Sequence, residues 1–355
     1  MATAVKRSLT KIEQVAKEGD LTVATPDPLP NVDPEDSGVA IVLPEKDGER
    51  TIHMPLVMGV PVHELACQLF DFERPSRSKF LRLIGLPGTG KSQLGRAIAL
   101  HAWGERGKDV EYRDGEPFYG YVEVSGGPSS DEYTFKYEFS PSAEDASTVK
   151  LIDALFVQAM LEGWLVMIDE PNTIRDIALM SLNAVFDGRL SLYLPAYGKN
   201  IVARPGFGCL LSYNPNQTSS ISDLPVSWYR RFPAVIEVNS NWPALVKAGA
   251  PERLVAAASD LDGRRLRGDA NLDWTPQYAE IESLWGMMER VGERHAISLF
   301  LTGVHERQQT GDVSEEELNA VCRMLDLAGF EHCHVLESSG IPRVGSYPRA
   351  VAGGM

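Results

Sequence analysis

The chain has 355 residues, of which 43% are hydrophobic and 23% charged, an ordinary globular composition for a protein long enough to form two domains. Its formal net charge of −15 argues against non-specific binding to nucleic acid, because a phosphate backbone requires a basic surface. No apolar run approaches the roughly 20 residues of a membrane helix, and residues 1–20 lack the apolar centre of a secretory signal. We therefore expect a cytoplasmic protein that does not insert into membranes.

The N-terminal region is predicted to be separate from the main domain. Residues 1–20 have a helical pattern, and residues 24–37 contain four prolines and four acids, a composition typical of an extended linker. Strand-like runs at residues 38–43 and 50–54 flank a turn and predict a β-hairpin. This hairpin is expected to open the next domain.

A glycine-rich loop follows the next apolar run. The segment LIGLPGTGKSQLG (residues 83–95) fits the spacing G-x-x-x-x-G-K-S, and residues 93–102 have a helical pattern. Glycines let the backbone N–H groups of such a loop converge on phosphate oxygens, and the start of the helix adds partial positive charge. The lysine of this motif reaches the β- and γ-phosphates, and its serine binds Mg²⁺. The sequence therefore predicts ATP and Mg²⁺ as ligands, held by Gly85, Leu86, Pro87, Gly88, Thr89, Gly90, Lys91, Ser92 and Gln93.

The elements after this loop alternate between strands and helices. Strand-like runs occur at residues 120–124, 164–168, 207–212 and 234–238, and helical patterns at residues 149–162 and 174–186. Such alternation predicts an α/β domain with a mostly parallel sheet covered by helices on both faces.

The pattern becomes almost wholly helical from residue 242 onward. The predicted helices are 243–247, 252–259, 277–291, 295–306 and 314–327. The basic run at residues 264–267 lies among acids and is expected to be a solvated loop. The predicted domains are an N-terminal helix and linker (1–37), a hairpin with the nucleotide-binding domain (38–240) and a helical domain (241–355).

Polar residues follow two of the apolar runs. In WLVMIDEPN, Asp169 and Glu170 come directly after the apolar run, and in GCLLSYNPN, Asn214 follows the next one. Carboxyl ends of parallel strands meet the ligand at one edge of a sheet, so Asp169 is predicted to bind Mg²⁺ opposite Ser92. Glu170 is predicted to polarise the attacking water, and Asn214 to orient it. An Asp-Glu pair can also be an ordinary polar strand end, and the phosphate loop makes that the weaker interpretation.

Five motifs together resemble the AAA+ ATPases, specifically the dynein-related group that includes the MoxR, CbbQ and NorQ proteins. They are GLPGTGKS, VMIDEPN, SYNPN, SWYRRF and GSYPRA, and the resemblance covers roughly residues 56–350. It implies a P-loop NTPase fold, in which an AAA+ core with a parallel sheet flanked by helices is followed by a C-terminal helical lid domain. Residues 85–92 look like Walker A, Asp169 and Glu170 like Walker B, and Asn214 like sensor 1.

The same resemblance implies that active sites are shared between subunits. Arg231, with Arg230 beside it, looks like the arginine finger, and Arg349 looks like sensor 2 in the lid. A guanidinium is permanently charged and can stabilise charge on the γ-phosphate, but Arg231 sits near the last apolar strand, away from its own loop. It would then serve a neighbouring subunit, and the family suggests a homohexameric ring. A solvated surface pair is the alternative interpretation of these two arginines.

Two inserted segments are candidates for contact with a substrate. Tyr133, Phe135, Tyr137 and Phe139 alternate with polar residues, which predicts a strand with all four aromatic rings on one face. By the resemblance this face grips a polypeptide, whereas packing on the core is the more common fate of an aromatic face. Residues 188–208 predict a second hairpin, which resembles the one before sensor 1 or is a plain sheet edge.

Cysteine spacing argues against a disulfide framework. Cys67, Cys209, Cys322 and Cys333 are widely spaced without a C-x-x-C pair, so we expect reduced thiols. The run His332-Cys333-His334 offers metal ligands, but side chains of alternate residues diverge and no fourth ligand is evident.

The sequence is best interpreted as an ATP-hydrolysing ring ATPase that remodels or activates a partner protein. CbbQ- and NorQ-like proteins often work with a von Willebrand factor A-domain adaptor, and the resemblance implies one here. A nucleotide-gated assembly or signalling module is the first alternative. A nucleic-acid motor or restriction-type NTPase is the second, against which the acidic charge argues.

Overall fold

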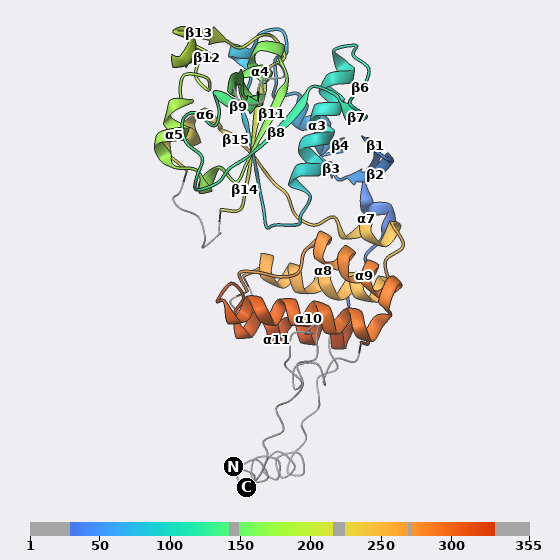
Figure 1. Ribbon diagram of the computed structural model, residues 1–355. Coiled ribbons are helices and arrows are strands. Elements are labelled where there is room, and N and C mark those ends of the chain that lie inside the picture. The colour runs from blue at the N-terminus through green and yellow to red at the C-terminus, as the bar shows by residue number, and fades with distance from the viewer. Residues whose placement is uncertain (1–28, 142–148, 216–223, 269–271, 331–355) are drawn as a thin grey trace, which may run out of the picture.

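The computed structural model describes residues 29–141, 149–215, 224–268 and 272–330. An α/β domain with a central sheet lies beside a domain made only of helices (Figure 1). The predicted helix at 1–20, Arg349 and the run 332–334 lie outside the described residues. Within the ranges given above, no helix is both long and apolar enough to cross a membrane.

The central sheet has five parallel strands in the order β15-β5-β14-β11-β8. Their bounds are β5 Leu81–Ile84, β8 Tyr121–Ser125, β11 Leu165–Asp169, β14 Gly208–Tyr213 and β15 Ala234–Glu237. The four runs predicted after the loop as strands are therefore confirmed. The flanking helices are α2 Val62–Cys67, α3 Lys91–Glu105, α4 Leu155–Glu162, α5 Asp176–Ser181 and α6 Val226–Arg231. Helix α3 lies on one side of the sheet, and α4, α5 and α6 lie on the other (Figure 1).

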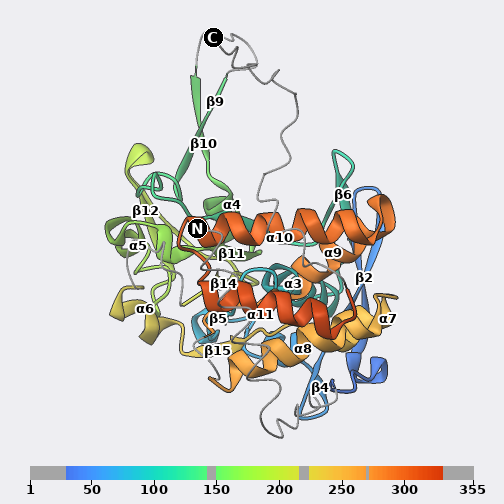
Figure 2. The same cartoon turned by 90° about the horizontal axis from the view of Figure 1, so that it is seen from below.

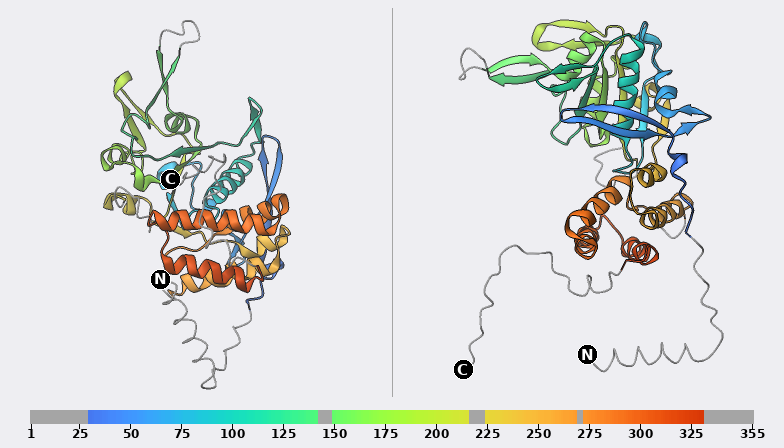
Figure 3. Two further views of the ribbon diagram at one scale, coloured as in Figure 1. Left: turned by 60° about the horizontal axis from the view of Figure 1, so that its bottom comes forward. Right: turned by 90° about the vertical axis from the view of Figure 1, so that its right-hand side faces the viewer.

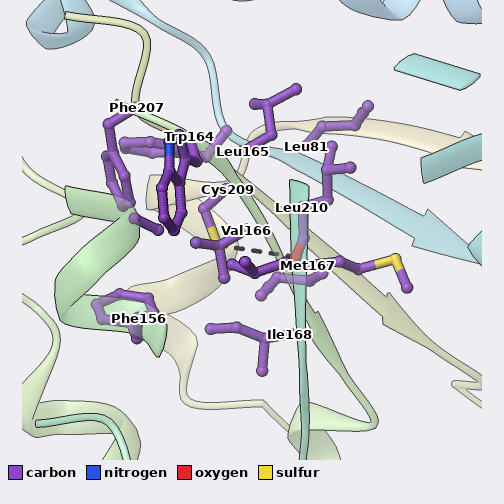
Figure 4. Packing of buried hydrophobic residues seen from close by; sticks show 14 of the residues in the cluster. Leu81, Phe156, Trp164, Leu165, Val166, Met167, Ile168, Phe207, Cys209 and Leu210 are labelled. Atoms are coloured by element: carbon purple, nitrogen blue, oxygen red, sulfur yellow. Dashed lines mark hydrogen bonds between the residues drawn. The ribbon is translucent and has the colours of Figure 1, made fainter. Parts of the chain in front are cut away.

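The sheet core explains why its strands form continuous apolar runs. The first four residues of β11 are buried, and Val166 and Ile168 have no exposed surface. Phe156 of α4 and Phe207 pack at the same core, which Figure 4 shows from close by. A parallel strand covered on both faces cannot alternate polar with apolar residues. This buried core holds the carboxyl ends of the strands in fixed register.

Short hairpins surround this core. The predicted N-terminal hairpin is confirmed as β1 Val39–Glu45 paired with β2 Gly48–Met54. The hairpin of β12 Ser191–Leu194 and β13 Lys199–Val202 confirms the second inserted segment. The remaining small elements are β3 Leu56–Val57, β4 Val60–Pro61, β6 Glu111–Arg113, β7 Glu116–Phe118 and the 3-10 turns Pro34–Ser37, Pro75–Arg77, Pro171–Thr173 and Pro195–Tyr197.

The helix predicted over 149–162 is wrong in its first third. Residues Val149–Asp153 form β10, antiparallel to β9 Tyr137–Pro141, and α4 begins only at Leu155. The hairpin extends away from the rest of the domain (Figures 2 and 3). Cross-strand pairing there outweighs the helical spacing of Leu151 and its neighbours. The helix predicted over 174–186 is likewise shorter, because α5 covers Asp176–Ser181.

The four alternating aromatics do not share one strand face. Tyr133 and Phe135 lie in turns before β9, and only Tyr137 and Phe139 belong to the strand. Phe135 and Tyr137 are buried in the core, whereas Tyr133 and Phe139 are 49% and 79% exposed. Neither sequence interpretation therefore holds for the whole set, because the turn changes the direction of the side chains before the strand begins.

The helical domain has its own core. Its helices are α7 Trp242–Lys247, α8 Glu252–Leu266, α9 Tyr278–Val291, α10 Glu293–Gln309 and α11 Glu315–Leu327. Trp242, Leu254, Ile281, Leu301 and Leu325 are among its buried residues. The basic run 264–267 continues α8 to its end instead of forming a predicted loop. Cations at a helix C-terminus interact favourably with the helix dipole, which accounts for this placement.

A buried polar network fixes the start of α9. Asp262 is 2% exposed, and its carboxylate accepts hydrogen bonds from Arg265, Thr275 and Gln277 at 2.9–3.0 Å. Gln277 caps α9 and also accepts a bond of 2.9 Å from the Ser240 hydroxyl. The network thus joins α8, α9 and the segment that leaves the sheet.

Replacing Asp262 by alanine is expected to lower the free energy of unfolding of the helical domain by about 3 kcal/mol, because the largely buried guanidinium of Arg265 loses its partner. Urea denaturation followed by circular dichroism measures the effect. Asp260→Ala on the same helix is the matched control, and about 0.5 kcal/mol or less is expected there. Equal losses from both variants would contradict a special role for the network.

Candidate nucleotide-binding site

A cavity of about 780 Å³ lies where the carboxyl edge of the sheet meets the helical domain. Its wall includes the glycine-rich loop, the ends of β11 and β14, strand β2 of the N-terminal hairpin, and helices α7 and α9. The sequence-predicted residues at this cavity are Pro87, Gly88, Thr89, Gly90, Lys91, Ser92, Gln93, Asp169, Glu170 and Asn214. Motifs more than a hundred residues apart in the sequence therefore meet in one site.

The loop between β5 and α3 requires glycine at particular positions. Gly85 has φ 153°, and a Cβ atom there would lie 2.3 Å from the Val238 carbonyl oxygen. Gly88 has φ 80°, and a Cβ atom there would lie 3.3 Å from the Cβ of Ala279. The Ala279 N–H also donates to the Gly88 carbonyl oxygen at 3.1 Å. The loop is thus held between α9 and Val238, the residue that follows β15.

The start of α3 is suited to an anion. Its first turn contains no acidic residue, and no side chain in the described part of the chain caps it. The first N–H groups of a helix have no partner within the helix and carry partial positive charge. Ser92 lies in this turn, on the cavity wall. The first N–H groups of α3 and the Ser92 hydroxyl are therefore suited to bind a phosphate chain.

Lys91 is the only lysine in the loop. Its Nζ donates to the carbonyl oxygens of Gly85 and Leu86, each at 2.9 Å. Burial lowers the pKa of Lys91, while the nearby carboxylates of Asp169 and Glu170 act in the opposite direction. The ammonium group is thus held over the loop and faces two carboxylates.

Lys91→Met is expected to weaken ATP binding by about 100-fold, because it removes charge-assisted hydrogen bonds to phosphate. Isothermal titration with ATP and Mg²⁺ measures the change. Lys247→Met is the matched control, since this lysine of α7 also lines the cavity but lies outside the loop. ATP affinity equal to that of the unaltered chain would contradict the assignment of Lys91 to the phosphates.

The two carboxylates stand where β11 ends. Asp169 is the last residue of β11, in register with Ser212 of β14. The next residue, Glu170, has φ 49° and ψ 49°, a left-handed conformation that is uncommon outside glycine. Backbone bonds hold it, because the Glu170 N–H donates to Ser212 at 2.8 Å and Gly126 donates to Asp169 at 2.7 Å. This turn brings both carboxylates to the cavity wall.

The candidate Mg²⁺ ligands fit a hard divalent cation. Ser92 supplies a hydroxyl and Asp169 a carboxylate, both on the cavity wall. Mg²⁺ prefers oxygen ligands and keeps several waters beside one or two carboxylates and the substrate phosphates. Asn214 follows β14 on the same wall, and its carbonyl oxygen accepts a bond of 3.5 Å from the Asn172 side chain.

Arg231 and Arg230 lie outside this cavity. Arg231 ends α6, and its guanidinium donates to the carbonyl oxygens of Asn183 at 3.3 Å and Ser227 at 2.9 Å. Arg230 is exposed. Among the described residues, the positively charged side chains on the cavity wall belong to Arg50, Lys91 and Lys247. The predicted sensor 2 residue, Arg349, is outside the described part of the chain.

The hairpin and the helical domain supply residues that sequence reasoning missed. Arg50 of β2 lies 3.5 Å from Glu282 of α9, so an ion pair joins the hairpin to the helical domain at the cavity wall. Tyr278 lines the same wall, and burial, together with Glu282, raises the pKa of its hydroxyl to about 12. Asn241, at the start of α7, donates to the His53 carbonyl oxygen at 3.0 Å. No motif marks these residues, because only the tertiary fold brings them to the loop.

Fold and site together define a P-loop NTPase with an AAA+ core and a helical lid. Residues 81–232 match the family model of the AAA domain (dynein-related subfamily), so this segment is an AAA domain. A stretch of 84 residues, 23% of the chain, is 33% identical to midasin of Dictyostelium discoideum and covers 1% of midasin's length. AAA domains are in general nucleotide-hydrolysing modules that use ATP with Mg²⁺.

Proposed function

We propose that this protein is an ATP-hydrolysing ring ATPase that remodels or activates a partner protein, as MoxR-, CbbQ- and NorQ-like proteins do. The observation that carries the proposal is an asymmetry of the site. The cavity is lined by the phosphate loop, two carboxylates, Asn214 and the lid, whereas the arginines predicted to act on the γ-phosphate lie outside it. A neighbouring subunit is the natural source of that charge.

Each residue of the cavity has a chemical role in this proposal. The loop amides and Lys91 bind the phosphates, and Glu170 accepts a proton from the attacking water. Asn214 orients that water without competing for the metal. Ser92 and Asp169 would hold Mg²⁺, and the bound ion would neutralise the negative charge that develops on the phosphates.

The lid would convert this chemistry into motion. Helix α9 touches the loop through the Ala279 N–H and lines the cavity through Tyr278. Bound ATP therefore favours the closed position of the lid, and hydrolysis releases it. In a homohexameric ring the same step changes the contact between subunits.

The client is proposed to contact the exposed aromatic rings of the inserted hairpins. Phe139 of β9 is 79% exposed, and Tyr193 of β12 is 53% exposed. The two insertions touch, since the Ala196 N–H donates to the Tyr137 hydroxyl at 2.8 Å. Aromatic side chains of this kind are common at protein contacts. A von Willebrand factor A-domain protein is the proposed adaptor, and the cytoplasm is the proposed compartment.

The test is ATPase rate per subunit measured against protein concentration, with light scattering on the same samples. A shared active site predicts that the rate per subunit rises steeply as rings form. A rate that is independent of concentration, from a monomer, would overturn the ring proposal and favour a nucleotide-gated scaffold. Binding of duplex DNA at low salt would instead revive the nucleic-acid motor.

A further inference from the structure

Helices α2 and α3 bring together a set of metal-binding side chains outside the nucleotide cavity. His63 and Cys67 are four residues apart on α2, and His101 and Glu105 are four residues apart on α3. Residues spaced in this way share one face of a helix. Ligand atoms of Cys67, His101 and Glu105 all lie within 4.8 Å of one another. The same limit holds for His63, Glu64 and His101, so the two groups share His101.

The distances within the first group already approach those of a metal site. The Cys67 Sγ lies 3.7 Å from Oε2 of Glu105, and Nε2 of His101 lies 3.3 Å from Oε1 of the same carboxylate. Zinc bonds of about 2.0–2.3 Å place tetrahedral ligand atoms roughly 3.3–3.8 Å apart. One cation can therefore replace the thiol proton between these groups with small side-chain movements.

The burial of His63 is an observation independent of the distances within the first group. His63 is 5% exposed, and its Nδ1 is buried with no hydrogen-bond partner among the residues that the structure describes. A buried polar atom without a partner costs free energy, so a native structure rarely leaves one unexplained. The rings of His63 and His101 are 5.4 Å apart and perpendicular. The unpartnered nitrogen thus belongs to a side chain that packs against His101, the residue that the two groups share.

We propose that Cys67, His101 and Glu105 bind one divalent cation of the Zn²⁺ type, with His63 as the fourth ligand. Thiolate and imidazole ligands select borderline-soft transition metals, and one cysteine, two histidines and a carboxylate match a tetrahedral zinc site. Mg²⁺ is excluded from this site by its preference for oxygen ligands. Cys67 loses its thiol proton to solvent as the metal–sulfur bond forms.

The site differs in position and chemistry from the proposed Mg²⁺ site. Ser92 lies in the first turn of α3, and His101 lies nine residues later, about 13 Å along the helix. Helix α2 begins at Val62, which lines the nucleotide cavity. A metal between the helices would clamp this segment to the helix that carries Lys91. The bound ion therefore stabilises the wall of the cavity rather than taking part in hydrolysis.

The experiment uses the full chain after removal of metals by a chelator. Titration with Co²⁺, a spectroscopic substitute for Zn²⁺, is followed through its thiolate charge-transfer and visible bands. We expect one equivalent to bind with tetrahedral spectra, and Zn²⁺ to displace it. Addition of Zn²⁺ should also raise the melting temperature by several degrees, because the metal binds the folded state.

Variants on both helices separate metal binding from a folding defect. Cys67→Ser is expected to abolish the charge-transfer band, and Glu105→Gln, whose side chain is 57% exposed, to weaken Co²⁺ binding at least tenfold. Cys322→Ser and His295→Gln are matched controls, since neither residue belongs to the two groups, and both should bind one equivalent.

Three outcomes would overturn the proposal. The first is that the unaltered chain binds neither Co²⁺ nor Zn²⁺. The second is that Cys67→Ser and Glu105→Gln both bind the metal as the unaltered chain does. The third is that the thiolate charge-transfer band is lost in Cys333→Ser but kept in Cys67→Ser. The last outcome would place the metal at the run 332–334. None of these measurements depends on ATP hydrolysis, so the proposed function stands or falls separately.

Discussion

Arg231→Ala is expected to lower kcat for ATP hydrolysis by about 1,000-fold, while ATP affinity changes little, because an arginine finger stabilises mainly the transition state. Arg231 ends α6 outside the cavity, and its guanidinium bonds only carbonyl oxygens in the described structure. The guanidinium can leave these neutral carbonyl oxygens and bind a phosphate instead, because a charged phosphate oxygen is the stronger acceptor. Steady-state ATPase assays and ATP titration measure the two parts of this prediction.

Mixing two inactive variants tests directly whether the arginine acts on a neighbouring subunit. Arg231→Ala keeps its phosphate loop, whereas Lys91→Met keeps its arginine, so rings that contain both retain some complete sites. We expect the mixture to recover part of the activity, although each variant alone has almost none. Arg230→Ala is the matched control at the adjacent exposed position and should have a much smaller effect.

Several results would contradict the prediction that Arg231 acts on the nucleotide of a neighbouring subunit. An Arg231→Ala protein that hydrolyses ATP at the normal rate would make Arg231 a surface residue. Equal losses in Arg230→Ala would point to damage of the helix rather than removal of one charge. A mixture that stays inactive while rings still form would place the arginine in its own site.

The parts of the site that the sequence predicts are those encoded by short local motifs. The glycine-rich loop, the carboxylates after β11 and the polar residues after β14 could be found because buried parallel strands are continuous apolar runs. Parallel strands also bring their carboxyl ends to one edge, so Asp169 and Asn214 could be placed near Lys91 without a structure. The strands themselves were predicted to within a residue or two of their observed bounds.

Long-range contacts account for what the sequence did not predict. One error had a nearby cause instead, because the helical spacing at 149–153 was overridden by antiparallel pairing with β9 in the same hairpin. Arg50 and Glu282 meet at the cavity wall although they are 232 residues apart. The cluster of His63, Cys67, His101 and Glu105 has two visible four-residue spacings, but only the packing of α2 on α3 brings the two pairs together. Local pattern cannot encode which helices become neighbours.

Glu170 has a strained backbone conformation that its surroundings impose. A non-glycine residue in the left-handed region costs roughly 1 kcal/mol, and such strain persists where the surroundings fix it. Its N–H is held by Ser212, and a Cβ atom on Gly126 would lie 2.5 Å from the Glu170 carbonyl oxygen. Close packing therefore forces the turn that presents this carboxylate to the cavity.

Glu170→Gln is expected to lower kcat by about 100- to 10,000-fold, because an amide cannot accept the proton of the attacking water. ATP binding should remain, since the phosphate loop and Lys91 are unchanged. Single-turnover hydrolysis and retention of ATP on the isolated protein measure the effect, and rings with trapped ATP should accumulate. A remodelling protein would lose action on its client with this variant, whereas a nucleotide-gated scaffold would keep its function.

Glu237→Gln is the matched control for this prediction, because Glu237 ends β15 and lines the same cavity without following the apolar strand β11. It loses the same charge, so a general change in the electrostatics of the cavity would lower the rate equally in both variants. Full hydrolysis by Glu170→Gln would transfer the general-base role to another carboxylate. Loss of hydrolysis in Glu170→Gln alone, with ATP retained, assigns the proton transfer to the strained turn after β11.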